Sequence, residues 1–201
     1  GLFFIAFDKK GVSTGDLKLD FAGTVDIQGT GGENKGIYMK DTIVSGTVDG
    51  NIILSDNSTG IYTDSSNFTT NAYIKVGART GTGTAVGIFA DNGAAVTNTG
   101  TVETGEAGIA HFAGNGAVID TSGTNIMADK STIAMAGAGG TINYNNSGDV
   151  FVGDNEKKGF AADGGIVNLT GGKTVNVGNN NSVGIIIGSS GSVNNINGIN
   201  V

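Results

Sequence analysis

Short apolar bursts separated by glycine and small polar residues recur along the whole chain. In residues 87–107 the apolar segments GIFA, AAV and TV are separated by short polar segments, and Gly108-Ile109 begins the same phrase again. Several bursts alternate apolar and polar residues, which is the pattern of a β-strand with one buried face. Glycine, Asn and Asp lie between the bursts, where tight corners and positive φ angles are needed. The pattern therefore predicts three short strands and three corners per repeat.

Each repeat begins with a glycine, in one case a threonine, that is followed by apolar residues. After a first step of 35 residues, the later steps range from 21 to 27 residues. Repeats of this length indicate a solenoid. We predict an all-β chain that forms one segment over residues 1–201, a right-handed parallel β-helix with three strands per coil and about eight coils. The predicted coils begin near Gly1, Gly36, Gly60, Gly87, Gly108, Thr132, Gly159 and Gly184.

Longer corners are predicted in the longer steps, because solenoids tolerate insertions at corners rather than within strands. The first step contains an insertion at residues 8–15, and the two 27-residue steps are expected to carry extra corner residues at 77–84 and 153–158. A rod of this kind exposes open sheet edges at both ends. Together with the abrupt start and end of the chain, this indicates a piece of a longer protein.

Alternation assigns a facing to each residue of the first strand in every coil. One inward column is predicted at Leu2, Ile37, Ile61, Ile88, Ile109, Ile133, Phe160 and Ile185. A second inward column is predicted two positions further on, at Phe4, Met39, Thr63, Ala90, His111, Met135, Ala162 and Ile187. An outward column is predicted between them, at Phe3, Tyr38, Tyr62, Phe89, Ala110, Ala134, Ala161 and Ile186.

Composition and charge narrow the classes of function. Glycine supplies 37 of the 201 residues, and the chain has no proline, cysteine or tryptophan. Without cysteine there is no disulfide and no thiolate metal site. The net charge of −7 disfavours nucleic acid, whose phosphates need clustered Lys and Arg. No apolar run approaches the ~20 residues of a membrane helix, and the opening GLFFIAF is too short, and lacks the basic flank, to be a signal peptide.

The repeated phrase GIYxxD, GIFADN or GFAADG, followed by NTGTV or TGGKTVNV, resembles the passenger domains of large type V (Va) autotransporter adhesins. It is most similar to the giant fusobacterial ones, and the likeness covers nearly the whole chain. The resemblance implies a right-handed parallel β-helix on the surface of a Gram-negative cell, anchored to the outer membrane through a β-barrel that lies outside this chain. It also implies adhesion to a surface protein or glycan of host cells or other bacteria, a role in virulence, and no cofactor.

The outward aromatic residues are the most suggestive surface feature. Phe3, Tyr38, Tyr62 and Phe89, one coil apart, would form a platform suited to the face of a sugar or to a partner protein. The alternative is that the rings pack on one another or lie under the insertion at residues 8–15.

Other residues that carry chemistry lack the partners that a site needs. His111 is the only histidine, so a catalytic or metal role has no second His or Cys, and we expect a structural role. Arg79 lies in GARTGTGT, but a phosphate-binding loop would need a strand before it and a helix after it. We expect Arg79 and the pairs Lys9-Lys10 and Lys157-Lys158 to be solvated. The acidic corners 154–156 and 56–57 are weak Ca²⁺ candidates that lack the calcium-binding repeat.

Three classes of function remain open. The first is a segment of an adhesin that carries a binding face, and the second is a spacer within such an adhesin. The third is a β-helical polysaccharide lyase or hydrolase, such as a tailspike. An enzyme of this kind usually has clustered carboxylates in a groove made by long loops, whereas here the carboxylates are scattered among short corners. We therefore expect a protein that is not an enzyme.

Overall fold

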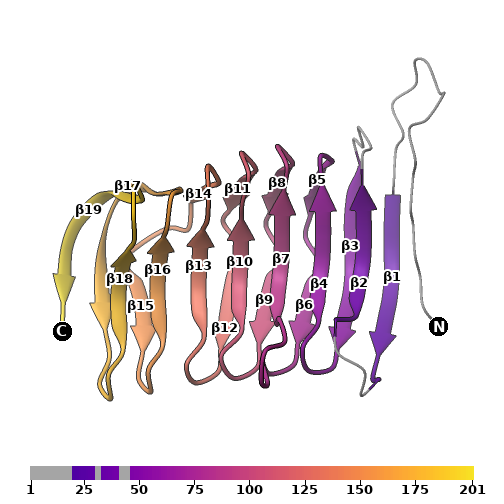
Figure 1. The fold of residues 1–201 in the computed structure, drawn as a ribbon, viewed down its shortest axis with the longest axis horizontal. Helices are drawn as coiled ribbons and strands as arrows, with labels where there is room; N and C mark the ends of the chain where they lie inside the picture. Colours follow the sequence, from indigo (N-terminus) through magenta and orange to yellow (C-terminus); the bar gives the residue numbers. More distant parts are fainter. Residues whose placement is uncertain (1–19, 30–32, 41–45) are drawn as a thin grey trace.

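The protein is described by a computed structural model that covers residues 20–29, 33–40 and 46–201. Over these ranges it is a parallel β-solenoid of about seven turns without a helix. The turns lie side by side along the long axis, from β1 near the N-terminal end to β19 at the C-terminal end (Figure 1). The predicted all-β solenoid with three strands per coil is confirmed. Most of the first predicted coil, with Leu2, Phe3, Phe4 and the insertion 8–15, lies outside the described residues.

One strand from each turn forms the first face, a seven-stranded parallel sheet in the order β18-β16-β13-β10-β7-β4-β2. Its strands are β2 (Lys35–Lys40), β4 (Thr59–Asp64), β7 (Val86–Asp91), β10 (Ile109–Ala113), β13 (Thr132–Ala136), β16 (Lys158–Ala162) and β18 (Val183–Ile187).

The second and third faces belong to one 12-stranded sheet, because four long strands run through the corner between them. The long strands are β1 (Asp20–Ile27), β3 (Thr47–Leu54), β17 (Ile166–Val177) and β19 (Ser192–Asn200). The second face also contains β5 (Asn67–Thr70), β8 (Ala95–Asn98), β11 (Val118–Thr121) and β14 (Thr141–Tyr144). The third face also contains β6 (Tyr73–Val76), β9 (Thr101–Thr104), β12 (Thr124–Met127) and β15 (Val150–Gly153).

Asparagine and glycine occupy most of the positions with positive φ angles, as the composition predicts. Asn57, Asn92 and Asn115 all have positive φ angles at corners of the solenoid. Gly50 has a φ angle of 94° where β3 passes from the second face to the third. Few other residues adopt such angles at low cost, so these residue types allow most corners to span only two to four residues.

The inward side chains of all three faces meet in one continuous core. On the first face the inward column is Ile37, Ile61, Ile88, His111, Ala134 and Phe160, all buried, followed by the half-buried Ile185. The second inward column is Met39, Thr63, Ala90, Ala113, Ala136 and Ala162, all buried. It ends at Ile187, which was predicted to point inward but is exposed, because β18 is the last strand of its sheet.

The predicted register is wrong in two coils, by two residues in the coil assigned to start at Gly108 and by one residue in the coil assigned to start at Thr132. Ile109 pairs with Val86, and it is His111 that lies opposite Ile88. The reason is that Gly108 belongs to a corner, where its N–H bonds to the carbonyl of Gly105. The Gly-Ile pair at 108–109 therefore resembles the start of other coils in sequence only.

In these two coils several residues face differently from the prediction. Ala110 and Ala134 were predicted to point outward, but both are fully buried. Met135 was predicted to point inward, but it pairs with the outward Phe112 and is partly exposed. Ile109 and Ile133 do not extend the column of Ile88, since Ala134 follows His111 in that column.

The third face is interrupted between β12 and β15, which do not pair with each other. The extra residues of this turn lie at 145–149, five residues between β14 and β15, where the three preceding turns have two. The prediction that placed them at 153–158 is wrong, because the corner between β15 and β16 has the usual four residues. Residues 77–85 form a nine-residue corner between β6 and β7.

Asparagine side chains form a ladder on the outer surface of the second face. Asn143 Nδ2 donates to Asp120 Oδ1 at 2.6 Å, Asn168 Nδ2 to Asn143 Oδ1 at 2.8 Å, and Asn194 Nδ2 to Asn168 Oδ1 at 2.9 Å. Each amide thus connects one turn to the next. The polar outer face reinforces the stacking that the apolar core drives.

Candidate functional site

The outward column of the first face holds four aromatic rings in consecutive turns. The strand pairing places Tyr38 opposite Tyr62, Tyr62 opposite Phe89, and Phe89 opposite Phe112. The ring centroids are 5.2, 5.0 and 4.5 Å apart along this column. Met135 continues the column in the next turn. We call these four rings the aromatic column.

The rings pack on one another, which was the alternative to a free platform. Tyr38 and Tyr62 are nearly parallel, with an interplanar angle of 13°, and the next two pairs are tilted by 33° and 35°. Nearly parallel rings with centroids about 5 Å apart are offset rather than eclipsed. Each ring therefore covers only part of the next, and all four side chains are half-buried. Part of each ring remains open to a ligand.

Phe112 is the member of the column that the sequence analysis missed. The two-residue register error placed Ala110 at this position. The motif GIFA at 87–90 recurs as AHFA at 110–113, and this recurrence of Phe-Ala was the signal in the sequence. Phe3, predicted to begin the column, lies outside the described residues.

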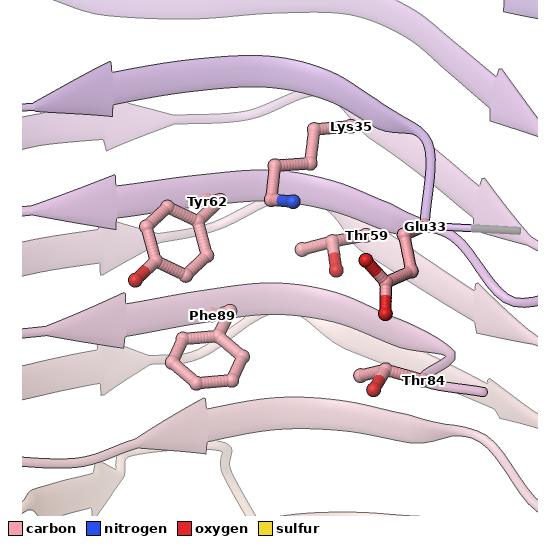
Figure 2. A pocket seen from close by; sticks show the side chains of 6 residues that line it. All are labelled: Glu33, Lys35, Thr59, Tyr62, Thr84 and Phe89. Atoms are coloured by element: carbon pink, nitrogen blue, oxygen red, sulfur yellow. The ribbon is translucent and has the colours of Figure 1, made fainter. Parts of the chain in front are cut away.

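Tyr62 is oriented by its hydroxyl group. The hydroxyl donates to Asp91 Oδ2 at 3.4 Å, and burial, followed by the charges of Asp91 and Asp64, raises the pKa of Tyr62 to about 12. In Figure 2 the hydroxyl points away from Lys35 and Glu33. The hydroxyl fixes the ring, while the ring itself faces the neighbouring hollow.

A hollow of about 180 Å³ lies beside Tyr62 and Phe89, and we call it the first hollow. Its remaining lining residues are Glu33, Lys35, Thr59 and Thr84. Figure 2 shows the two rings on one side and Thr59, Glu33 and Thr84 on the other, with Lys35 reaching toward Tyr62. The Lys35 ammonium lies 5.7 Å from the centroid of Tyr62, within range of a cation–π interaction.

A second hollow, of about 250 Å³, lies on the far side of Phe89. Its lining is mainly apolar, with Arg79 and Thr84 at the corner that follows β6. The two hollows share Phe89 and Thr84. The residues that line the second hollow are Arg79, Gly83, Thr84, Ala85, Val86, Phe89, Ile109, Phe112 and Met135.

The only histidine is part of the core. His111 is fully buried, with Nε2 3.1 Å from Asn98 Nδ2 and 3.3 Å from Thr121 Oγ1. Its Nδ1 lies 3.4 Å from the carbonyl oxygen of Ile133. Burial lowers the pKa of His111 to about 4. The ring is neutral at pH 7 and its contacts lie inside the solenoid, away from the aromatic column.

The charged side chains at the corners form hydrogen bonds with the backbone and do not gather into a cluster of ionisable groups. Asp56 Oδ1 accepts from the N–H of Ala78 at 2.7 Å, and Asp154 Oδ1 accepts from the N–H of Asn179 at 2.6 Å. Arg79 is exposed, and its Nε donates to the carbonyl of Gly83 at 3.0 Å. Over residues 20–29, 33–40 and 46–201, no group of three or more His, Asp or Glu side chains could hold a metal ion. Lys9 and Lys10 lie outside these ranges.

The comparisons with known proteins identify no relative. No protein-family model, no curated protein and no solved structure matches this chain. In the part of the chain that the structure describes, no helix has the length and apolar character needed to cross a membrane.

Proposed function

We propose that this chain is a surface-exposed segment of a bacterial autotransporter adhesin that attaches to a protein or glycan on host cells or other bacteria. The support is the resemblance of its repeats to such passengers, together with a fold that suits the role. About seven stacked turns form a stiff rod that holds outward side chains in regular columns.

The aromatic column is the observation that favours a binding face over a pure spacer. A spacer needs only a continuous core and polar outer faces, and the asparagine ladder of the second face meets that need. The first face instead places four aromatic side chains in one half-buried row, next to two hollows. Aromatic side chains provide a large contact area at low cost in conformational entropy, which suits recognition.

A spacer role is the second candidate, and the regular stacking of the turns favours it. Parallel pairing is continuous on the first face from β2 to β18. In this case the segment only extends a binding tip away from the cell surface.

Replacement of whole turns separates the two roles. The chain is displayed on a non-adherent Gram-negative cell, and attachment to epithelial cells and to other bacteria is counted. The turns 59–108 are then deleted, or replaced by the same number of foreign solenoid turns that have a polar first face. If the segment carries a binding face, attachment should disappear even in the variant whose foreign turns restore the length of the solenoid. Attachment that survives both changes, with only a shorter reach after the deletion, would contradict the binding face.

Substitution of the rings tests the column separately. Tyr38, Tyr62 and Phe89 are replaced together by Ser in the displayed chain, with Phe151→Ser on the third face as the control. Phe151 is 77% exposed, so its removal disturbs no packing. Unchanged attachment in the triple variant would remove the column from the proposal.

A further inference from the structure

The two hollows on either side of Phe89 are too small for one large ligand. Their volumes are about 180 and 250 Å³, whereas pockets for drug-sized molecules are ~300–1,000 Å³. Each hollow fits a single ring or a short side chain. Because both include Phe89 and Thr84, a ligand that fills both must be a chain of small units that crosses Phe89.

The lining of the first hollow combines an apolar surface with hydrogen-bonding groups of both kinds. Tyr62 and Phe89 supply ring surface, Lys35 supplies donors, and Glu33 supplies acceptors. The hydroxyl groups of Thr59 and Thr84 can both donate and accept. A pyranose has the matching chemistry, because its C–H face packs on aromatic rings while its hydroxyl groups donate and accept around its rim.

The charges around the hollows favour a neutral ligand. Lys35 and Glu33 line the same hollow, so their charges oppose each other there. The Nε of Arg79, beside the second hollow, donates to the carbonyl of Gly83, and the remaining N–H groups of its guanidinium can donate to the hydroxyl or carbonyl groups of a neutral ligand. The chain as a whole carries a net charge of −7, which repels acidic polymers.

We propose that the two hollows bind consecutive sugar rings of a neutral oligosaccharide, with Phe89 between them. This inference rests on the proposed attachment function and names the class of its ligand. The first hollow takes the more hydroxylated ring, next to Lys35 and Glu33. The second hollow, which Ile109, Phe112 and Met135 line, takes the ring with the more apolar substituent, such as an N-acetyl methyl group.

The test is titration of the purified 201-residue chain with four neutral tetrasaccharides: maltotetraose, cellotetraose, tetra-N-acetylchitotetraose and lacto-N-tetraose. Calorimetry measures the Kd, and thermal melting verifies that each variant is folded. We expect at least one of them to bind, and Phe89→Leu to raise its Kd by about two- to tenfold, because the loss of one aromatic contact corresponds to a change of about that size. Thr84→Val removes the hydroxyl group common to both hollows without disturbing the rings, and it should also raise the Kd.

One control variant should bind as the unmodified chain does. Phe151→Leu removes an exposed ring from the third face. The inference is wrong if none of the four sugars binds. It is also wrong if Phe89→Leu and Thr84→Val, both folded, bind as tightly as the unmodified chain.

A second measurement distinguishes failure of the ligand class from failure of the attachment function. Beads coated with the chain are incubated with epithelial cells before and after periodate oxidation of the cell-surface sugars. Attachment that resists periodate but disappears after mild trypsin treatment of the cells indicates a protein partner. That result overturns the oligosaccharide and leaves the attachment function standing. Absence of attachment to any cell, with the tetrasaccharide binding intact, overturns the attachment function alone.

Discussion

Ile88 lies directly opposite His111 in the first-face sheet, so the only imidazole of the chain occupies an aliphatic column. Both side chains are fully buried. The partners of His111 are Asn98, Thr121 and the carbonyl of Ile133, all uncharged. No counter-charge among these partners stabilises the protonated ring, so the core holds the imidazole in its neutral form.

The stability of the solenoid should therefore decrease in mild acid because of His111. The pKa of His111 is lowered from 6.5 to about 4 by burial, so the unfolded chain binds a proton at a pH where the folded chain does not. Stability is full above pH 6.5 and falls as the pH drops toward 4. Between pH 7.5 and pH 4.5 the loss due to this residue is about 2–3 kcal/mol.

Urea unfolding at these two pH values measures the effect, with His111→Gln as the variant that cannot titrate. The difference in unfolding free energy between pH 7.5 and pH 4.5 should be smaller in His111→Gln by the same amount. An identical pH dependence in the two proteins would show that His111 can be protonated within the folded state.

The register of β7 and β10 can be tested by a disulfide, because the chain has no cysteine of its own. Phe89 and Phe112 are partners in the pairing, and the Cα atoms of adjacent strands are close enough for an S–S bond. Phe89→Cys with Phe112→Cys should crosslink on mild oxidation, as mass spectrometry would detect. The pair Phe89→Cys with Ala110→Cys should not form a disulfide. Efficient crosslinking of that pair would support the register predicted from the sequence, in which Ala110 lies opposite Phe89.

Gly87 should not tolerate a side chain. A Cβ at this position would lie 2.2 Å from Val102 Cγ1 and 2.7 Å from the carbonyl oxygen of Ala110. Gly87→Ala should lower the free energy of unfolding by about 1–3 kcal/mol. At Gly198 the nearest atom to a new Cβ is 3.9 Å away, so Gly198→Ala should change stability by less than about 0.5 kcal/mol. Chemical denaturation measures the free energy of unfolding of both variants. An equal loss of stability in the two would contradict the close packing around Gly87.

Lys173 should stabilise the five-residue corner at 145–149. Its side chain is 4% exposed, and Nζ donates to the carbonyls of Asn146 and Gly148, the latter at 3.1 Å. Lys173→Met keeps the apolar stem but loses both hydrogen bonds, which should cost about 1–3 kcal/mol. Amide exchange in residues 145–149 should also become faster.

The control for Lys173 is Lys75, whose ammonium forms an exposed ion pair with Glu103 at 2.8 Å. Lys75→Met should cost less than about 1 kcal/mol, because solvent weakens an exposed pair. Higher stability of Lys173→Met than of the unmodified chain would mean that burial of the ammonium costs more than its two hydrogen bonds contribute.

Part of the candidate site could be predicted from the sequence. Tyr38, Tyr62 and Phe89 each follow a Gly-Ile pair, and alternation alone placed all three outward. Alternation counted from Gly108-Ile109 misplaced Phe112, because its strand begins after a corner whose length differs from that of the preceding corner. Only the recurrence of Phe-Ala marked its position. The two hollows were not visible in the sequence either, because they depend on the path of the corner at 77–85.

The sequence by itself determined the architecture, because apolar bursts with period-2 alternation, repeated many times between Gly and Asn corners, have few other ways to bury their apolar faces. Only the tertiary structure decided the register. Hydrogen bonds between turns, such as that from Ile109 N to Ala85 O at 2.9 Å, select which residues face each other across corners of unequal length. The local sequence pattern does not specify this pairing. The stacking of the turns therefore decides that His111 lies opposite Ile88 and that Phe112 joins the aromatic column.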